Sequence, residues 1–143
     1  MSHQGMVHAL REAHRVLKTN GLLIDLRPAA EHRRVGVSEG DGYRLPWVMR
    51  ENFDDDRAAD RAVAQVVLEG RFKTEGRTRF ACYRLMDTLE DFLEWLTDFV
   101  DRGKLPSHDW LVRLVERALK ASAGKTNIVV SAPLVSQALR KQE

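Results

Sequence analysis

Residues 9–24, ALREAHRVLKTNGLLI, contain the change of hydrophobic period that predicts the fold of the chain. From just before this stretch to its middle, apolar residues recur every three or four positions, at Met6, Leu10, Ala13 and Leu17. This spacing predicts an amphipathic helix, and Asn20-Gly21 ends it because both residues tolerate positive φ. The apolar run Leu22–Leu26 follows at once and stops before Pro28. Such a run is typical of a strand buried on both faces of a parallel sheet.

Downstream, the patterning predicts further strands and helices. They are a possible hairpin of Arg33–Val37 with Tyr43–Trp47, a helix opened by Asp54, a strand at Thr78–Leu85, a helix capped by Thr88, a helix starting at Pro106-Ser107, and a strand at Ile128–Ala132 that continues through Leu134–Leu139 after a bulge. Pro133 within the last strand favours an edge position, because proline cannot donate to a ladder. The sum is one α/β domain over residues 1–143, with about three main strands, a possible hairpin, four helices and an irregular segment at 28–52.

Composition narrows the function classes. The 143 residues are 43% hydrophobic and 31% charged, with a net charge of +2, which predicts a folded domain rather than a disordered chain or a strongly basic nucleic-acid binder. We expect no membrane span, no secretory signal and no metal site, since Cys82 is the single cysteine. The cytoplasm is the expected compartment, and Cys82, within an alternating strand, is expected in the core.

The segment Arg15-Val16-Leu17-Lys18 followed by Gly21 resembles the "RVLKPGG" motif of class I S-adenosylmethionine-dependent methyltransferases. Thr19 and Asn20 replace the proline and the first glycine of that motif. In the family this helix leads into the fifth strand of a Rossmann-like sheet. The resemblance implies that Thr78–Leu85 is the sixth strand and Ile128–Leu139 the seventh, so the chain corresponds to the C-terminal half of the fold.

The cofactor-binding half of that family has no counterpart in the sequence. The only G-x-G, Gly40-Asp41-Gly42, lies in the expected hairpin turn and not between a strand and a helix. We therefore expect a methyltransferase-like domain that is not catalytic alone and binds no cofactor alone. The alternative is a truncated or split methyltransferase, which would use S-adenosylmethionine once the missing half is supplied.

The loop after the fifth strand borders the substrate side in the resembled family. The candidates for substrate contact there are Arg27, His32, Arg33, Arg34 and Trp47. His32 is the candidate general base, and the arginines would bind an anionic substrate. The plainer interpretation is a solvated loop, and the residues alone do not decide between the two.

The resemblance also places the fifth strand between the fourth and the seventh. With no fourth strand in the sequence, one edge of the strand containing Leu22, Leu23, Ile24 and Leu26 would be exposed, and exposed apolar edges associate. We therefore predict a homo-oligomer, in the simplest form a dimer, or a partner polypeptide bound at this edge.

A third interpretation is a small-ligand or nucleic-acid-binding module. A basic run with interleaved aromatic residues supports it, consisting of Arg71, Phe72, Lys73, Arg77, Arg79, Phe80, Tyr83 and Arg84. Glu69 and Glu75 dilute the charge of this run, so nucleic acid is the weaker expectation.

Overall fold

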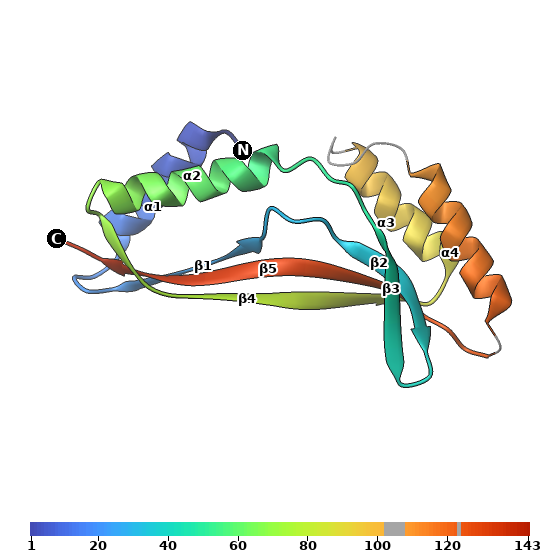
Figure 1. Cartoon of the computed structure of the whole chain (residues 1–143). Coiled ribbons are helices and arrows are strands. Elements are labelled where there is room, and N and C mark those ends of the chain that lie inside the picture. Colours follow the sequence, from blue (N-terminus) through green and yellow to red (C-terminus); the bar gives the residue numbers. More distant parts are fainter. Residues whose placement is uncertain (102–107, 123) are drawn as a thin grey trace. The chain divides into compact units, whose positions relative to one another are not determined.

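The structure is a computed structural model that describes residues 1–101, 108–122 and 124–143. In chain order, its elements are α1 His3–Val16, β1 Leu22–Pro28, β2 Arg34–Glu39, β3 Gly42–Val48, α2 Asp54–Leu68, β4 Phe72–Met86, α3 Leu89–Asp101, α4 Asp109–Ala121 and β5 Ile128–Lys141 (Figure 1). The described chain is therefore an α/β protein with four helices, and none of these helices is long and apolar enough to cross a membrane.

The five described strands form one antiparallel, open sheet in which β5 pairs with β1, β2 and β4, and β3 pairs with β2. The strand order is β1-β5-β2-β3, and β4 pairs with β5 as well. β1 pairs with β5 from Leu22 opposite Arg140 to Pro28 opposite Leu134. The expectation of a parallel sheet around Leu22–Leu26 is therefore wrong, because the neighbour of this strand runs in the opposite direction.

The expected edge position for the strand containing Pro133 is also wrong. β5 lies inside the sheet and runs without a break from Ile128 to Lys141. Its ladder with β2 ends at Ser131, and its ladder with β1 begins at Leu134. Pro133 falls between these two ladders, where its missing N–H removes no bond to either strand.

The described residues divide into two compact units. Unit 1 comprises Met1–Ala30, Phe53–Phe80 and Leu134–Glu143, and unit 2 comprises Glu31–Asn52 and Ala81–Pro133. The long strands β4 and β5 each contribute one part to unit 1 and the other part to unit 2.

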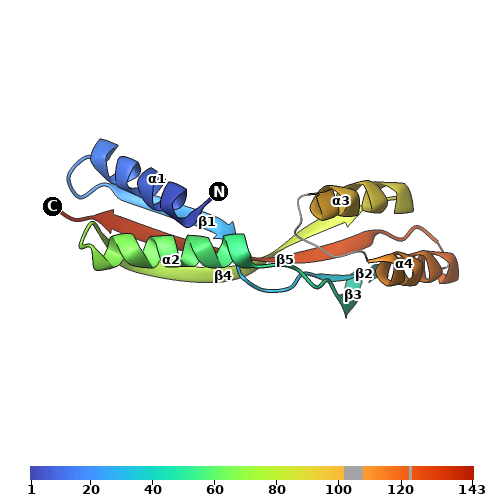
Figure 2. The ribbon, with the colours of Figure 1, turned by 90° about the horizontal axis from the view of Figure 1, so that it is seen from above.

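In unit 1, α1 and α2 cover one face of the sheet formed by β1, β5 and β4. Viewed from above, α1 lies over β1 and α2 lies over β4 (Figure 2). Their apolar faces meet the sheet in a cluster of buried side chains, which includes Val7, Ala62, Val66, Phe72 and Leu139. Ser2 caps α1 by accepting the N–H of Gly5 at 3.1 Å.

Unit 2 has its own core between the β2–β3 hairpin, the first part of β5 and the helices α3 and α4. The largest fully buried side chains of this core are those of Phe92, Met49, Leu111 and Ile128. The predicted hairpin is confirmed, with Glu39 opposite Gly42 at its turn. The capping role of Thr88 is confirmed as well, since its hydroxyl accepts the N–H of Asp91 at 3.1 Å.

Of two further expectations, one falls outside the described residues and one is wrong. The predicted helix start at Pro106-Ser107 lies outside the described residues, and α4 begins at Asp109. The core position expected for Cys82 is wrong, because its side chain is exposed on β4. An alternating sequence does not tell whether a strand is covered, and β4 is exposed along almost its whole length.

Candidate functional site

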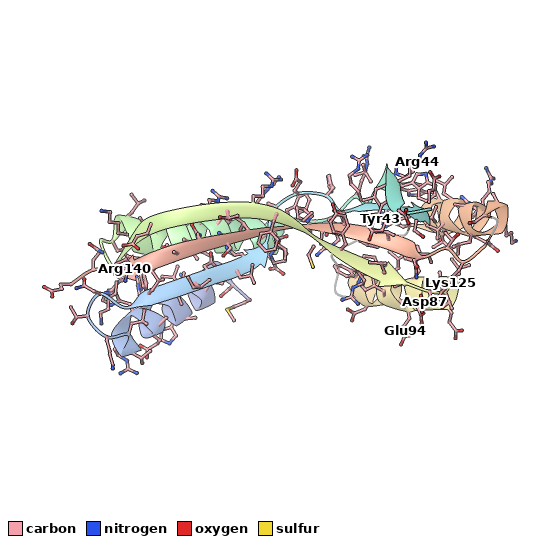
Figure 3. All side chains as sticks on the ribbon, turned by 90° about the horizontal axis from the view of Figure 1, so that it is seen from below. Tyr43, Arg44, Asp87, Glu94, Lys125 and Arg140 are labelled. Atoms are coloured by element: carbon pink, nitrogen blue, oxygen red, sulfur yellow. The ribbon has the colours of Figure 1, made fainter. Side chains whose placement is uncertain are left out.

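β1 has one covered face and one open face, and the open face is apolar. The exposed fractions of Leu22, Ile24 and Leu26 are 40%, 57% and 59%. Leu23 points to the other face and packs against the core of unit 1. Seen from below, no helix covers this part of the sheet (Figure 3). Three of the four residues predicted to form an association edge thus lie on the open face, and Leu23 does not.

The outer edge of β1 carries backbone groups that no described strand pairs with. The N–H of Lys141 donates to the carbonyl of Gly21 over 2.9 Å, so these residues form a hydrogen-bonded pair of the antiparallel ladder. Such pairs alternate with non-bonded pairs. The odd-numbered residues of β1 therefore turn their N–H and C=O groups toward β5, and the even-numbered residues turn theirs toward the free edge. The residues with exposed apolar side chains are thus the same residues that offer the unpaired backbone groups.

Pro28 agrees with this alternation. It is an even-numbered residue of β1, so its nitrogen faces the free edge and its missing N–H breaks no bond to β5. The part of the free edge that can form a full set of backbone hydrogen bonds is therefore the segment from Leu22 to Leu26.

Other strands of the sheet carry charged residues or proline, which oppose association at a sheet edge. β4 carries several charged side chains, namely Lys73, Glu75, Arg77, Arg79 and Arg84. β3 contains Arg44 and Pro46. Charges and proline on an edge strand oppose pairing with another chain. The segment Leu22–Leu26 has neither a proline nor a charge on its open face.

On the covered face of β1, Arg27 is held in an ion-pair network rather than presented to solvent. Its guanidinium pairs with Asp25 at 2.9 Å and with Asp60 of α2, and Gln137 donates to Asp25 at 2.9 Å. Burial alone would lower the pKa of Arg27, but the hydrogen bonds to Asp60 and Asp25 outweigh it and raise this pKa above its ordinary value. Arg27 therefore links β1 to α2.

In unit 2, His32 and Arg33 come together through Glu51, whose side chain is only 5% exposed. Glu51 accepts the backbone N–H of Arg33 at 2.8 Å and pairs with its guanidinium. The backbone N–H of Glu51 in turn donates to Nδ1 of His32 at 3.1 Å. The Arg33 guanidinium also lies 4.8 Å from the centre of the Phe99 ring. These contacts hold residues 32–33 against residue 51, and the contact of Arg33 with Phe99 links them to α3.

The other two candidates for substrate contact also have structural positions. Arg34 donates to the carbonyl of Leu45 across the hairpin at 3.1 Å, and Trp47 is partly buried against the core of unit 2. The structure thus brings His32 and Arg33 together, gives Arg34 and Trp47 places in the hairpin, and assigns Arg27 to unit 1.

Two hollows are lined by residues that sequence reasoning did not select. One, of about 450 Å³, lies between α1 and α2 and is lined by His3, Gln4, Val7, Arg11 and Gln65. The other, of about 170 Å³, lies between α3 and α4 and has a mostly apolar lining that also includes His108 and Asp109. Among the residues that the structure describes, no group of three or more histidine, cysteine or carboxylate side chains is arranged to hold a metal ion.

Sequence reasoning also missed a pair of stacked tyrosines in unit 2. The rings of Tyr43 and Tyr83 lie 5.5 Å apart at 27°, and their exposed fractions are 51% and 49%. Arg44 beside Tyr43 forms an exposed ion pair with Glu39 at 3.6 Å. Only the aromatic content of the two strands pointed to this pair in the sequence.

Comparison of the chain with models of protein families, with curated proteins and with solved structures found no match.

Proposed function

We propose that the chain is a methyltransferase-like assembly domain that associates through the free edge of β1 and does not transfer methyl groups on its own. The pairing of β1 with β5 supports the resemblance, because it is the contact implied between the fifth and seventh strands. The free edge of β1 lies where the resemblance places the fourth strand. Docking at this edge is therefore the role that best fits the geometry.

The residues around β1 support a role in assembly rather than in catalysis. Gly40 and Gly42 lie at the turn between β2 and β3, so the only G-x-G of the sequence does not lead into a helix. Arg27 and Arg33 are both engaged with carboxylates, at Asp60 and Glu51. These two arginines link elements of the fold, and their guanidinium groups are already paired with carboxylates.

One observation carries the proposal: the segment from Leu22 to Leu26 is apolar, open and unpaired at the same time. An edge of this kind promotes association unless it is covered. The occupant is a second copy or a partner polypeptide, and the exposed thiol of Cys82 fits a reducing compartment such as the cytoplasm.

A split methyltransferase is the second candidate, and the same edge favours it. A cofactor-binding half that docks its fourth strand on β1 would supply the site for S-adenosylmethionine. His32 would then be a candidate for substrate contact, with Nδ1 already accepting from Glu51 and the other ring nitrogen, Nε2, as the second polar atom of the ring.

Calorimetric titration of the chain with S-adenosylhomocysteine tests the proposal. We expect no binding at ligand concentrations up to the millimolar range, because no cofactor loop is present in the sequence. Micromolar binding by this chain alone would contradict the proposed function. Far-UV circular dichroism of the same sample controls for loss of the fold.

A further inference from the structure

We infer that a second copy of this chain docks on the free edge of β1, with the two β1 strands antiparallel and Ile24 on the two-fold axis. This inference rests on the association role proposed above. It names the occupant of the edge and the register of the pairing.

The symmetry of the segment supports a second copy. A two-fold axis brings the same patch of two identical chains together, so the patch must be complementary to itself. With Ile24 on the axis, Ile24 faces its own copy, and Leu22 faces Leu26 of the second copy. Every N–H and C=O group that Leu22, Ile24 and Leu26 turn toward the free edge then finds a partner. Each exposed apolar side chain gains an apolar neighbour across the junction.

Neighbouring registers are less favourable. A shift of two residues in one direction places Asp25 opposite Asp25 of the second copy, and like charges in that position are destabilising. A larger shift in the same direction pairs Ile24 with Pro28, which has no N–H to donate. A shift the other way brings Leu26 toward Asn20, whose φ of 61° takes it out of the extended conformation.

Charge on the covered face is also compatible with this register. Asp25 lies opposite Leu23 of the second copy, and its carboxylate is already bonded by Arg27 and Gln137. In this register the Asp25 carboxylate therefore keeps its own partners and does not face a second carboxylate.

The flank of α1 on the same side of unit 1 is also open and apolar. His3 and Arg11 point toward α2, where they bond Gln65 and Glu69. At 100° per residue, the opposite flank of the helix carries Ala9 and Val16, the latter 67% exposed, and beside them Glu12, whose carboxylate is paired with Arg15 at 2.9 Å. Because α1 lies over β1 (Figure 2), a two-fold pairing of the strands places this flank beside its own copy. The helix thus extends the apolar surface that begins at the free edge.

Disulfide trapping tests both the occupant and the register. In a Cys82→Ser background, Ile24→Cys places one thiol of each copy on the axis, where paired residues have Cα atoms about 5.5 Å apart. That separation is within the range for a disulfide. Leu26→Cys is the matched control on the same open face. Its thiols would be separated by four residue steps along the strand, about 14 Å, and cannot bond.

We expect copper-phenanthroline to convert most of the Ile24→Cys protein to a covalent dimer, and the Leu26→Cys protein at least tenfold less. Preferential trapping of Leu26→Cys would overturn the register. Sedimentation equilibrium at tens of micromolar should give twice the monomer mass for the unmodified chain and the monomer mass for Ile24→Lys. Leu85→Lys, at a position on β4 that is 49% exposed against 57% for Ile24, should remain dimeric.

A monomeric unmodified chain, or an Ile24→Lys variant that stays dimeric, would overturn the inference. Neither result bears on cofactor binding, which the titration with S-adenosylhomocysteine tests separately. Ile24 is more than half exposed, so its substitution leaves the core of unit 1 intact, and circular dichroism checks this.

Discussion

The N–H of Lys141 donates to the carbonyl of Gly21 over 2.9 Å, and this one hydrogen bond fixes the direction of the backbone groups along β1. Side-chain direction and hydrogen-bond direction both alternate every second residue in a strand. The residues whose N–H and C=O groups point to the free edge therefore all have their side chains on the same face of the sheet. In β1 that face is the open apolar face, so backbone pairing and apolar contact act at the same three residues.

The close packing of β2 on β3 leads to the first prediction. A Cβ atom added at Gly36 would lie 1.8 Å from the carbonyl oxygen of Arg44, and this oxygen belongs to backbone that cannot rotate away. We expect Gly36→Ala to lower the free energy of unfolding by about 2–3 kcal/mol, as overpacking does. Urea unfolding followed by tryptophan fluorescence measures this. Gly76→Ala is the control, since nothing lies within 4 Å of its added Cβ, and equal losses in both variants would contradict the prediction.

The buried carboxylate of unit 2 leads to the second prediction. Glu51→Gln keeps the shape of the side chain but removes the charge that faces Arg33, whose side chain is only 15% exposed. We expect a loss of about 3 kcal/mol in the free energy of unfolding, at the lower end for broken buried pairs. Glu39→Gln breaks an exposed pair with Arg44 and should cost less than about 0.5 kcal/mol. Similar unfolding midpoints for the two variants would show that the buried Glu51 pair stabilises the fold no more than the exposed Glu39 pair does.

The local features of the fold could be predicted because their causes are local. The predicted helix end at Asn20-Gly21 is wrong, because α1 already ends at Val16 with an extended cap at Leu17. Asn20 does adopt a positive φ, 61°, in the turn that follows, and Thr88 caps α3 through its own hydroxyl. The hairpin follows from a turn rich in glycine and aspartate, and Gly40 there has a φ of 56°. These residues act on neighbours within a few positions, so the sequence alone contains the information.

The remaining features depend on partners that are distant in the chain. An apolar run such as Leu22–Leu26 has the same pattern whether its outer face is buried or open, so the sequence could not distinguish the two. The position of Pro133 is tolerated because two ladders end on either side of it, and no local pattern encodes that. Two of the three arginines proposed for substrate contact, Arg27 and Arg33, are paired with Asp60 and Glu51, and such long-range pairs are visible only in the folded chain.

The third prediction concerns acid stability. Hydrogen bonds from Arg11, then from Gln65 and Arg71, lower the pKa of Glu69 from 4.5 to about 2. A carboxylate with a lowered pKa in the folded state stabilises the protein above its unfolded pKa, and this stabilisation is lost as the pH falls through the folded pKa. The contribution of Glu69 should therefore disappear between pH 4.5 and about 2.

Thermal unfolding measured from pH 6 to pH 2 tests this. The melting temperature of the unmodified chain should fall more steeply through this window than that of Glu69→Gln. Arg11→Ala should remove part of the same slope, because Arg11 is the largest cause of the shift. Addition of 1 M NaCl should reduce the difference between the variants, since the group lies at the surface. Parallel curves for the unmodified chain and Glu69→Gln would exclude this role.

The turn between α1 and β1 leads to the last prediction. Asn20 adopts the left-handed conformation, with a φ of 61°, and its carbonyl accepts Nη1 of Arg140 at 2.8 Å. Because the acceptor is a backbone atom, substitution at this position keeps that bond and changes only the cost of the positive φ. Alanine should destabilise the chain by about 1 kcal/mol, because most L-residues pay this cost in the left-handed region. Glycine should leave the free energy of unfolding unchanged or slightly higher. A urea unfolding series of Asn20→Ala and Asn20→Gly gives the order directly, and an alanine variant as stable as the glycine variant would mean that the turn relaxes out of the left-handed conformation.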